Sequence, residues 1–288
     1  MNTVNIHYSK ANNAGDKLNK ELFEYFGNYK VNRSDALNSL ISGIGSGLGE
    51  YTYSDSKKKN IKKFINGIIH PTVYIFGTGF LEYSSKKEHF FKRNMKFLAL
   101  RGNLTKERVE KILNRKIDIA IGDPGILISE LIDIECFNKS IENKYEVGII
   151  AHFKEKDEEA FKKLVNHYPN SLFIDIQDEP LEVAKNILSC KTILSSSLHG
   201  LIFSDSLRIP NIHIVATNKL LGDGYKFDDY YSGFGIDHTF IDINNENYPD
   251  LSEVKKEYKI TSQMVQNMKT ELLIKFPKIK ENGTKVYY

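Results

Sequence analysis

The segment Ser195–Gly200 (SSSLHG) places three hydroxyl side chains beside a histidine and a glycine. It follows the apolar run Thr192–Leu194 and precedes the apolar stretch Leu201–Leu207, so we expect it at a strand-to-helix junction. The free backbone N–H groups and the helix dipole at such a junction favour a phosphate or a carboxylate. His199 at the mouth of this site could donate a hydrogen bond or transfer a proton near neutral pH. The alternative is a capping cluster with a structurally packed histidine.

Two further cations follow predicted strands. Arg101 ends the run Phe97–Leu100, and a guanidinium at the carboxyl end of a strand suits bidentate recognition of a carboxylate or phosphate. Lys219 follows the run Ile212–Ala216, and its ammonium could face the same anion. Each could instead be an ordinary surface charge.

The loop Asn12–Asn19 joins the first predicted strand to the first predicted helix. Asn13 and Asp16 would place an amide and a carboxylate near the anion site, and Asp16 is the second candidate, after His199, for acid–base work. Asp16 could equally be only the N-cap of the helix. His152, after the run Glu146–Ala151, could approach the same place.

Two loops have less specific patterns. Gly122-Asp123-Pro124 is typical of a turn, with Asp123 capping and proline at the first helical position. The stretch Gly222–Gly233 contains Lys226, Asp229 and Tyr230, and its interleaved tyrosines and acids suggest a sugar-binding loop with exposed rings. A packed surface loop is the alternative.

Short β-rich runs alternate with amphipathic stretches along the chain, which is typical of parallel sheets covered by helices. The predicted strands are Val4–Tyr8, Leu40–Ile44, Thr72–Phe76, Phe97–Leu100, Asp118–Ile121, Glu146–Ala151, Leu172–Ile176, Thr192–Ser195, Ile212–Ala216 and Phe240–Ile243. We predict an α/β fold in which two Rossmann-like domains, residues 1–140 and 141–288, face each other across a cleft. Cys136–Tyr145 is the expected linker, and Leu251–Phe276 is expected to be helical.

The composition excludes several classes of protein. The 288 residues carry a net charge of only +3, which by itself does not indicate nucleic-acid binding. HExxH and P-loop motifs are absent and the two cysteines lack metal-ligand spacing, so we expect no metal and no nucleotide phosphoryl transfer. Since no apolar run approaches the roughly 20 residues of a membrane span, we expect a cytoplasmic protein. The basic run Lys57–Lys63 predicts either a solvated amphipathic helix or a surface for anionic lipids.

A series of segments resembles, in order, the polysaccharide pyruvyltransferase family. They are Asn13–Asn19 (NAGDKLN), Gly77–Gly79, Leu100–Thr105 (LRGNLT), Ile121–Leu127 (IGDPGIL), Gly148–Phe153 (GIIAHF), Ser195–Gly200, Asp205–Pro210 (DSLRIP) and Lys226–Gly235 (KFDDYYSGFG). Ala151 and Gly125 depart from the family, which often has proline and usually alanine at these places. Neither change removes a charged group.

The resemblance implies a fold similar to glycosyltransferases of the B type and phosphoenolpyruvate as the donor substrate, with no other cofactor. Arg101 and His199 match the basic residues that hold the donor, and Lys219 matches a third by spacing and strand-end position only. The first domain would hold the acceptor and Arg101, and the second would hold the donor. The other expected substrate-binding residues are Ser195, Ser196, Ser197, Leu198, Gly200, Asn13, Gly79, His152, Lys226, Asp229 and Tyr230.

The implied reaction transfers the pyruvyl group to a sugar as a cyclic ketal during the synthesis of capsule, exopolysaccharide or cell-wall glycan. Galactose on a lipid-linked oligosaccharide, at the inner face of the cell membrane, is the family-level expectation for the acceptor. A B-type glycosyltransferase that uses a nucleotide sugar fits the same fold. A non-catalytic carbohydrate-binding protein is the third interpretation, but it leaves the Arg–His–Lys grouping unexplained.

Overall fold

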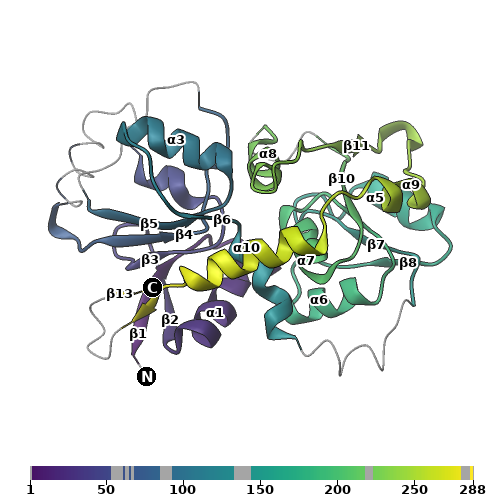
Figure 1. Cartoon of the computed structure of the whole chain (residues 1–288). Coiled ribbons are helices and arrows are strands. Elements are labelled where there is room, and N and C mark those ends of the chain that lie inside the picture. The colour runs from purple at the N-terminus through teal and green to yellow at the C-terminus, as the bar shows by residue number, and fades with distance from the viewer. Residues whose placement is uncertain are drawn as a thin grey trace.

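Two parallel sheets form the framework of the computed structural model, which describes residues 2–52, 61, 65, 68–84, 93–132, 144–217, 223–279 and 286–287 (Figure 1). The first sheet has the order β2-β1-β3-β4-β5-β6. Its strands are β1 (Thr3–His7), β2 (Lys30–Ser34), β3 (Ile41–Ser42), β4 (Val73–Phe76), β5 (Met95–Leu100) and β6 (Ala120–Ile121). The second sheet has the order β11-β10-β9-β7-β8. Its strands are β7 (Val147–Ile150), β8 (Ser171–Phe173), β9 (Ile193–Ser195), β10 (Asn211–Val215) and β11 (Phe240–Asp242).

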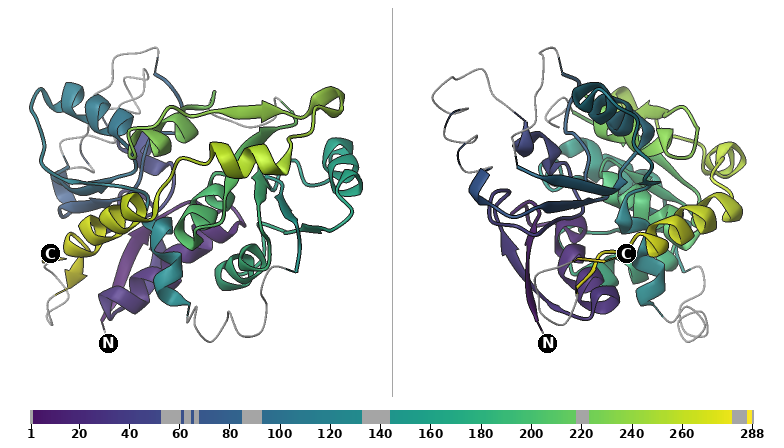
Figure 2. Two further views of the ribbon diagram at one scale, coloured as in Figure 1. Left: turned by 45° about the vertical axis from the view of Figure 1, so that its right-hand side comes forward. Right: turned by 60° about the vertical axis from the view of Figure 1, so that its left-hand side comes forward.

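Helices pack around both sheets (Figures 1 and 2). The α-helices are α1 (Ala14–Gly27), α3 (Asn103–Leu113), α5 (Glu159–His167), α6 (Pro180–Leu188), α7 (Leu198–Leu207), α8 (Tyr225–Ser232), α9 (Leu251–Glu257) and α10 (Ser262–Ile274). The 3-10 segments are η1 (Gly47–Tyr51), η2 (Pro124–Leu131) and η3 (Asn244–Glu246), and β12 (Lys278–Ile279) and β13 (Val286–Tyr287) form an antiparallel pair. The predicted α/β class with parallel sheets is confirmed.

Every run that was predicted as a strand overlaps an observed strand, but β2, β12 and β13 were not predicted. The reason is clearest for β2. Its sequence, KVNRS, has a single apolar residue and therefore lacks the alternation that identifies a half-buried strand. It pairs only with β1, in parallel, at the edge of the first sheet. Its backbone pairing, rather than burial of its side chains, holds it in place.

One hydrophobic core runs continuously from the first sheet to the second. It joins Leu18 on α1, Ile126 on η2, Ile187 on α6 and Ile202 on α7. The helix α7 is buried along its length except at His199, which is half-buried. Because α7 is buried on nearly all sides, it suits a position between elements of both halves.

The end of the chain returns to the first sheet. Helix α10 packs against β6 and η2, and in Figure 1 it runs from the second sheet towards the first. Beyond it, the Phe276 ring lies 5.3 Å from that of Phe23 and 5.1 Å from that of Phe76. The predicted boundary at residue 140 lies outside the described residues and stays a prediction.

Some sequence predictions concern residues that the structure does not describe. These include Lys219, Cys136 and the lysines of the basic run. The second cysteine, Cys190, is a buried free thiol. Among the described helices, none combines the length and apolar character needed to cross a bilayer.

Candidate active site

A cavity of about 290 Å³ lies at the carboxyl ends of strands from both sheets. In open parallel sheets this edge is where ligands bind, because the loops that leave the strands converge there. Its lining residues are Ser9, Ala11, Asn13, Asp16, Gly45, Ser46, Leu81, Arg101, Asp123, His152, Phe153, Lys154, Ser197, Leu198, His199 and Lys226. The cavity therefore draws together segments that are more than 200 residues apart in sequence.

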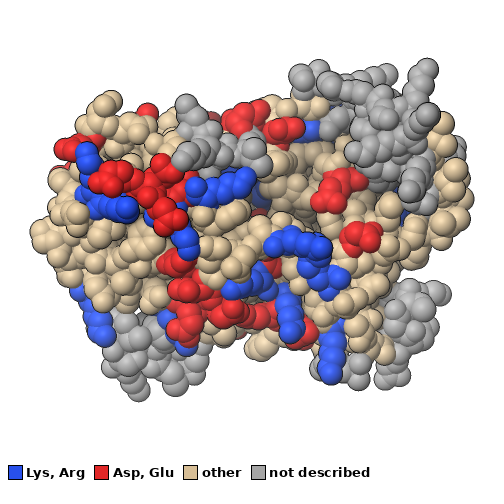
Figure 3. Space-filling model, turned by 180° about the vertical axis from the view of Figure 1, so that it is seen from behind, with Lys and Arg blue, Asp and Glu red and all other residues tan. Residues whose placement is uncertain are grey.

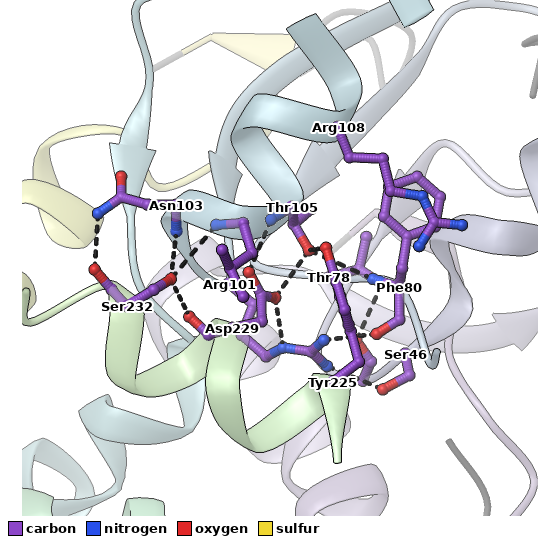
Figure 4. Close-up of polar contacts among 12 residues, drawn as sticks. Ser46, Thr78, Phe80, Arg101, Asn103, Thr105, Arg108, Tyr225, Asp229 and Ser232 are labelled. Carbon is purple, nitrogen blue, oxygen red and sulfur yellow. Dashed lines mark hydrogen bonds and ion pairs between the residues drawn. The ribbon is translucent and has the colours of Figure 1, made fainter. Parts of the chain in front are cut away.

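Arg101 follows β5 and is fully buried (Figure 4). Its Nε donates to Asp229 Oδ2 at 2.9 Å, its Nη1 to Ser46 Oγ at 2.8 Å and its Nη2 to the Phe80 carbonyl at 2.5 Å. A Cβ atom at Gly79 would lie 2.6 Å from the guanidinium carbon, so glycine there makes room for the group. The guanidinium is thus rigidly held while it lines the cavity.

The partner of Arg101, Asp229, also joins α8 to α3. Its Oδ1 accepts from the Thr105 backbone N–H and its Oδ2 from the Thr105 hydroxyl, both at 2.7 Å. Gly102, the N-cap residue of α3, has no side chain with which to cap. A Cβ atom at Gly102 would lie 1.6 Å from the Asp229 carbonyl oxygen, so glycine permits the contact. The carboxylate from α8 therefore supplies the missing cap, and this fixes α8 over the cavity.

Lys226 on α8 contributes a second cation to the cavity. Burial lowers the pKa of Lys226 to about 8, and the Arg101 charge acts in the same direction. The ammonium is therefore still mainly protonated at pH 7. Its Nζ has no hydrogen bond or ion pair with any residue that the structure describes, although it lies 5.1 Å from the Phe227 ring centroid. It is available to an anionic ligand.

His199 lies in the first turn of α7, beside the first turn of α1. Burial, followed by the charges of Lys226 and Arg101, lowers the pKa of His199 to about 3, so the imidazole is neutral in the empty cavity. Its buried Nε2 has no hydrogen-bond partner within the described part of the chain. The first backbone N–H groups of α7 also lack intrahelical acceptors, which favours an anion beside them.

The close contact between Gly15 and His199 makes a testable prediction. A methyl group added at Gly15 would lie 2.0 Å from His199 Nδ1. Alanine normally stabilises a helix relative to glycine, but here we expect Gly15→Ala to destabilise the protein by about 1–3 kcal/mol because the imidazole must move. Urea unfolding measures this effect. Gly49→Ala is the matched control, since its Cβ would meet nothing within 4 Å, and an equal effect in both variants would contradict the predicted contact.

Two carboxyl groups complete the cavity. The Asn13 amide donates to Asp16 Oδ2 at 2.6 Å, and Asn13, not Asp16, is the N-cap of α1. Burial raises the pKa of Asp16 to about 6. Asp123 caps η2 as predicted, since its Oδ1 accepts from Gly125 N at 2.9 Å. Burial likewise raises the pKa of Asp123 to about 6, and its Oδ2 has no partner among the described residues.

The serine cluster divides into two parts. Ser195 Oγ bonds within the loop to the backbone of Ser197, and Ser196 Oγ donates to Glu155 Oε2 at 2.8 Å. Ser196 Oγ also accepts from the His152 backbone N–H at 2.8 Å. Ser195 and Ser196 thus position the loop, whereas Ser197, the N-cap residue of α7, faces the cavity.

The structure brings most of the predicted residues together. Those that line the cavity are Arg101, His199, Asp16, Asn13, His152, Ser197, Leu198 and Lys226. Those that do not line it are Ser195, Ser196, Gly200, Gly79, Asp229 and Tyr230. Cavity residues that were not predicted to be functional include Ser46, which binds Arg101, and Lys154, which is exposed at the rim. Asp123 was predicted only to cap a helix.

The predicted loop of exposed tyrosines is wrong. Tyr225–Ser232 within this stretch form α8, and Tyr225 and Tyr230 are buried. The Tyr230 hydroxyl donates to Asp205 Oδ2 at 2.9 Å, which satisfies its polar atom inside the core. Both Asp229 oxygens are already used in binding Arg101 and capping α3. This helix therefore supplies Lys226 to the cavity rather than a stacking platform for a sugar.

A shallower groove of about 620 Å³ adjoins the cavity and shares Ser9, Ala11 and Asp16 with it. Its other lining residues are Tyr8, Lys10, Asn12, Lys17, Lys20, Glu21, Glu24, Arg33 and Glu179. Cations and carboxylates are therefore mixed along it. The surface in Figure 3 likewise shows blue and red side chains interspersed over the described residues.

Comparison with known proteins identifies the family. A sequence model described as polysaccharide pyruvyl transferase matches residues 4–218. The chain is 33% identical over 285 residues to the uncharacterised protein L143 of Acanthamoeba polyphaga mimivirus, covering 94% of this chain and 90% of the relative. More distant likenesses are to the solved structure of protein KP1_0663 from Klebsiella pneumoniae (15% identity, TM-score 0.47, 83% and 92% covered) and to a variant of the wall teichoic acid polymerase TagF (9%, 0.40, 96% and 83%). Because the family match spans well over half of the chain, the protein belongs to the polysaccharide pyruvyl transferase family and is a transferase.

Proposed function

We propose that the protein transfers the pyruvyl group of phosphoenolpyruvate to a sugar as a cyclic ketal. The observation that carries this proposal is the meeting of Arg101, His199 and Lys226 in one cavity, beside the N-terminus of α7. Phosphoenolpyruvate bears a phosphate and a carboxylate on the same carbon, so a site for it needs several cationic or N–H donors. In this proposal Lys226 is the third donor-binding group; the role of Lys219 stays a prediction.

Each group has a distinct task in the proposed reaction. Arg101, held by Ser46 and Asp229, offers a fixed guanidinium, and Lys226 offers an ammonium that has no polar partner among the described residues. The His199 imidazole and the first N–H groups of α7 donate hydrogen bonds to the phosphate, where charge develops as it leaves. Asp16 is placed to accept a proton from the attacking hydroxyl, because it lines both the cavity and the adjoining groove.

The acceptor is proposed to lie in the groove that adjoins the cavity. Its mixture of ammonium, guanidinium, carboxylate and tyrosine groups suits a hydroxyl-rich chain, which both donates and accepts hydrogen bonds. A lipid-linked oligosaccharide used at the inner face of a membrane, in the synthesis of capsule, exopolysaccharide or cell-wall glycan, is the proposed acceptor. The exposed side chains of Ile61, Ile65, Ile68 and Ile69 support peripheral membrane contact.

Donor binding is tested by ligand-induced stabilisation. Phosphoenolpyruvate at about 100 times its dissociation constant should raise the melting temperature by roughly 4–5 °C. Lys226→Met should lose most of this shift, because it removes the unpaired ammonium but keeps a similar side-chain length. Lys162→Met is the matched control, since Lys162 is exposed on α5 and should leave the shift unchanged.

The same experiment separates the proposed reaction from its nearest competitor. A nucleotide-sugar transferase would be stabilised by nucleotides and not by phosphoenolpyruvate, and that outcome would overturn the proposal. Incubation with phosphoenolpyruvate and candidate acceptors, followed by mass spectrometry, should then show a sugar heavier by one pyruvyl ketal.

A further inference from the structure

Two polar atoms in the cavity are buried without a partner. The described part of the chain has five buried side-chain nitrogen or oxygen atoms that make no hydrogen bond, and two of these, Asp123 Oδ2 and His199 Nε2, belong to cavity residues. Unsatisfied buried polar atoms are rare in folded proteins because each one costs free energy. Their presence in one cavity indicates a ligand that supplies the missing contacts.

The two side chains lie close together, and both lie next to Gly125. A Cβ atom at Gly125 would lie 3.1 Å from Asp123 Oδ1 and 3.5 Å from His199 Cδ2. The bond from Gly125 N to Oδ1 fixes the carboxyl group, so Asp123 cannot easily turn away from the cavity. If the phosphate of the pyruvyl donor contacts His199, the reactive carbons of that donor therefore lie near Asp123.

We propose that Asp123 is the catalytic acid that protonates the methylene carbon of the enol donor. This inference rests on the proposed function, because only an enol ester donor has a methylene carbon that must become a methyl group. It assigns to Asp123 a role beyond its cap, and it leaves His199 as a hydrogen-bond donor to the phosphate.

The charges around Asp123 suit a group that begins the reaction protonated. Burial raises its pKa most, and Asp229 on α8 and Asp16 on α1 raise it further, whereas the Gly125 N–H and the Arg101 charge lower it. His199 on α7 is neutral in the empty cavity and adds no opposing charge. A bound phosphate and carboxylate raise the pKa again, since like charges disfavour ionisation. Binding of the substrate thus favours the protonated form of Asp123, which is the form that acts as the acid.

Two carboxyl groups, those of Asp123 and Asp16, account for every proton that is transferred in the reaction. The Asp123 O–H bond breaks, and the π electrons of the enol form the new C–H bond of the methyl group. The first sugar hydroxyl bonds to the central carbon and gives its proton to Asp16. Phosphate leaves with the electron pair of its C–O bond and takes the Asp16 proton. The second hydroxyl of the same sugar closes the ketal and returns a proton to Asp123.

Asp123→Asn tests this role, because asparagine keeps the oxygen that caps η2 but has no acidic proton. We expect phosphate release with an acceptor to fall by about 10²–10⁴-fold, while the melting shift caused by phosphoenolpyruvate remains. The wild-type turnover rate should fall at high pH as the acid ionises; Asp123→Glu should keep this fall, displaced in pH, and Asp123→Asn should lose it. Asp250→Asn is the matched control, because Asp250 caps α9 through a 2.7 Å bond from Ser252 N and lies outside the cavity.

The possible outcomes are distinguishable. Activity of Asp123→Asn within about threefold of wild type overturns the inference, and so does loss of donor binding together with activity, which indicates a structural or binding role. If Asp123→Asn does not melt cooperatively, Asp123→Ser, which also retains a capping oxygen, takes its place under the same criteria. If the wild-type protein consumes no phosphoenolpyruvate with any acceptor, the proposed function itself fails.

Discussion

In the His199→Ala variant we expect phosphate release from phosphoenolpyruvate and a sugar acceptor to fall by about 10²–10³-fold. The imidazole is held against Gly15, and its Nε2 has no protein partner among the described residues, so its hydrogen-bonding capacity is free for the donor. The imidazole is a hydrogen-bonding group that stabilises the charge that develops on the phosphate. Its removal weakens binding of the transition state more than binding of the substrate. The rate constant should therefore fall more than the donor affinity.

Comparison with a remote histidine controls for general effects of the substitution. His167 lies exposed at the end of α5, and His167→Ala should retain wild-type rates. His199→Ala should still melt cooperatively, because the imidazole makes no hydrogen bond to the part of the chain that the structure describes. Near-wild-type phosphate release by His199→Ala would remove His199 from the site.

Replacing Arg101 by methionine is expected to destabilise the protein by about 3–5 kcal/mol, because it leaves the buried Asp229 carboxylate without its ion-pair partner. Both side chains are fully buried, so the Asp229 carboxylate would be left without a cation in a low-dielectric environment. The bonds to Ser46 and Phe80 are lost as well. Urea unfolding measures the change, and Arg115→Met, at an exposed position, should stay within about 0.5 kcal/mol of wild type.

A double variant separates stability from donor binding. Asp229→Asn removes the buried charge while its side-chain oxygen can still accept from Thr105 N, so Arg101→Met/Asp229→Asn should be more stable than Arg101→Met alone. The melting shift caused by phosphoenolpyruvate should remain small in both. If the double variant regains the full shift, Arg101 only supports the fold.

The fold was largely predictable because the buried strands are apolar and end in polar or glycine residues. The second sheet carries such runs as Val147–Ile150, whose four residues are all buried. β2 was missed because its pairing with β1 depends on backbone hydrogen bonds, which cannot be recognised from the pattern of apolar and polar side chains. The crossing of α10 to the first sheet was also not predictable, since an amphipathic pattern does not say which surface covers it.

The site was predictable at residues whose type and position in the sequence favour a single function. Arg101 and His199 follow strands, and parallel topology brings such positions together. Tyr230 and Asp229 were misassigned because tyrosines and acids serve equally in sugar sites and in packed networks. Asp123 was predicted to cap a helix, but a sequence does not show that one of its two carboxyl oxygens has no hydrogen-bond partner among the described residues. Gly102 has no side chain with which to cap α3. This was the one local signal that a hydrogen-bond acceptor from another part of the chain, here Asp229, caps the helix.

The return of the C-terminal segment to the first sheet has a consequence for synthesis on the ribosome. Phe276 packs on Phe23 and Phe76, and the Tyr29 hydroxyl donates to the Pro277 carbonyl at 3.2 Å. These contacts join residues about 200 to 250 positions apart, so they form only after the segment that follows α10 has emerged from the exit tunnel. The first sheet is therefore completed only after the second sheet has been translated.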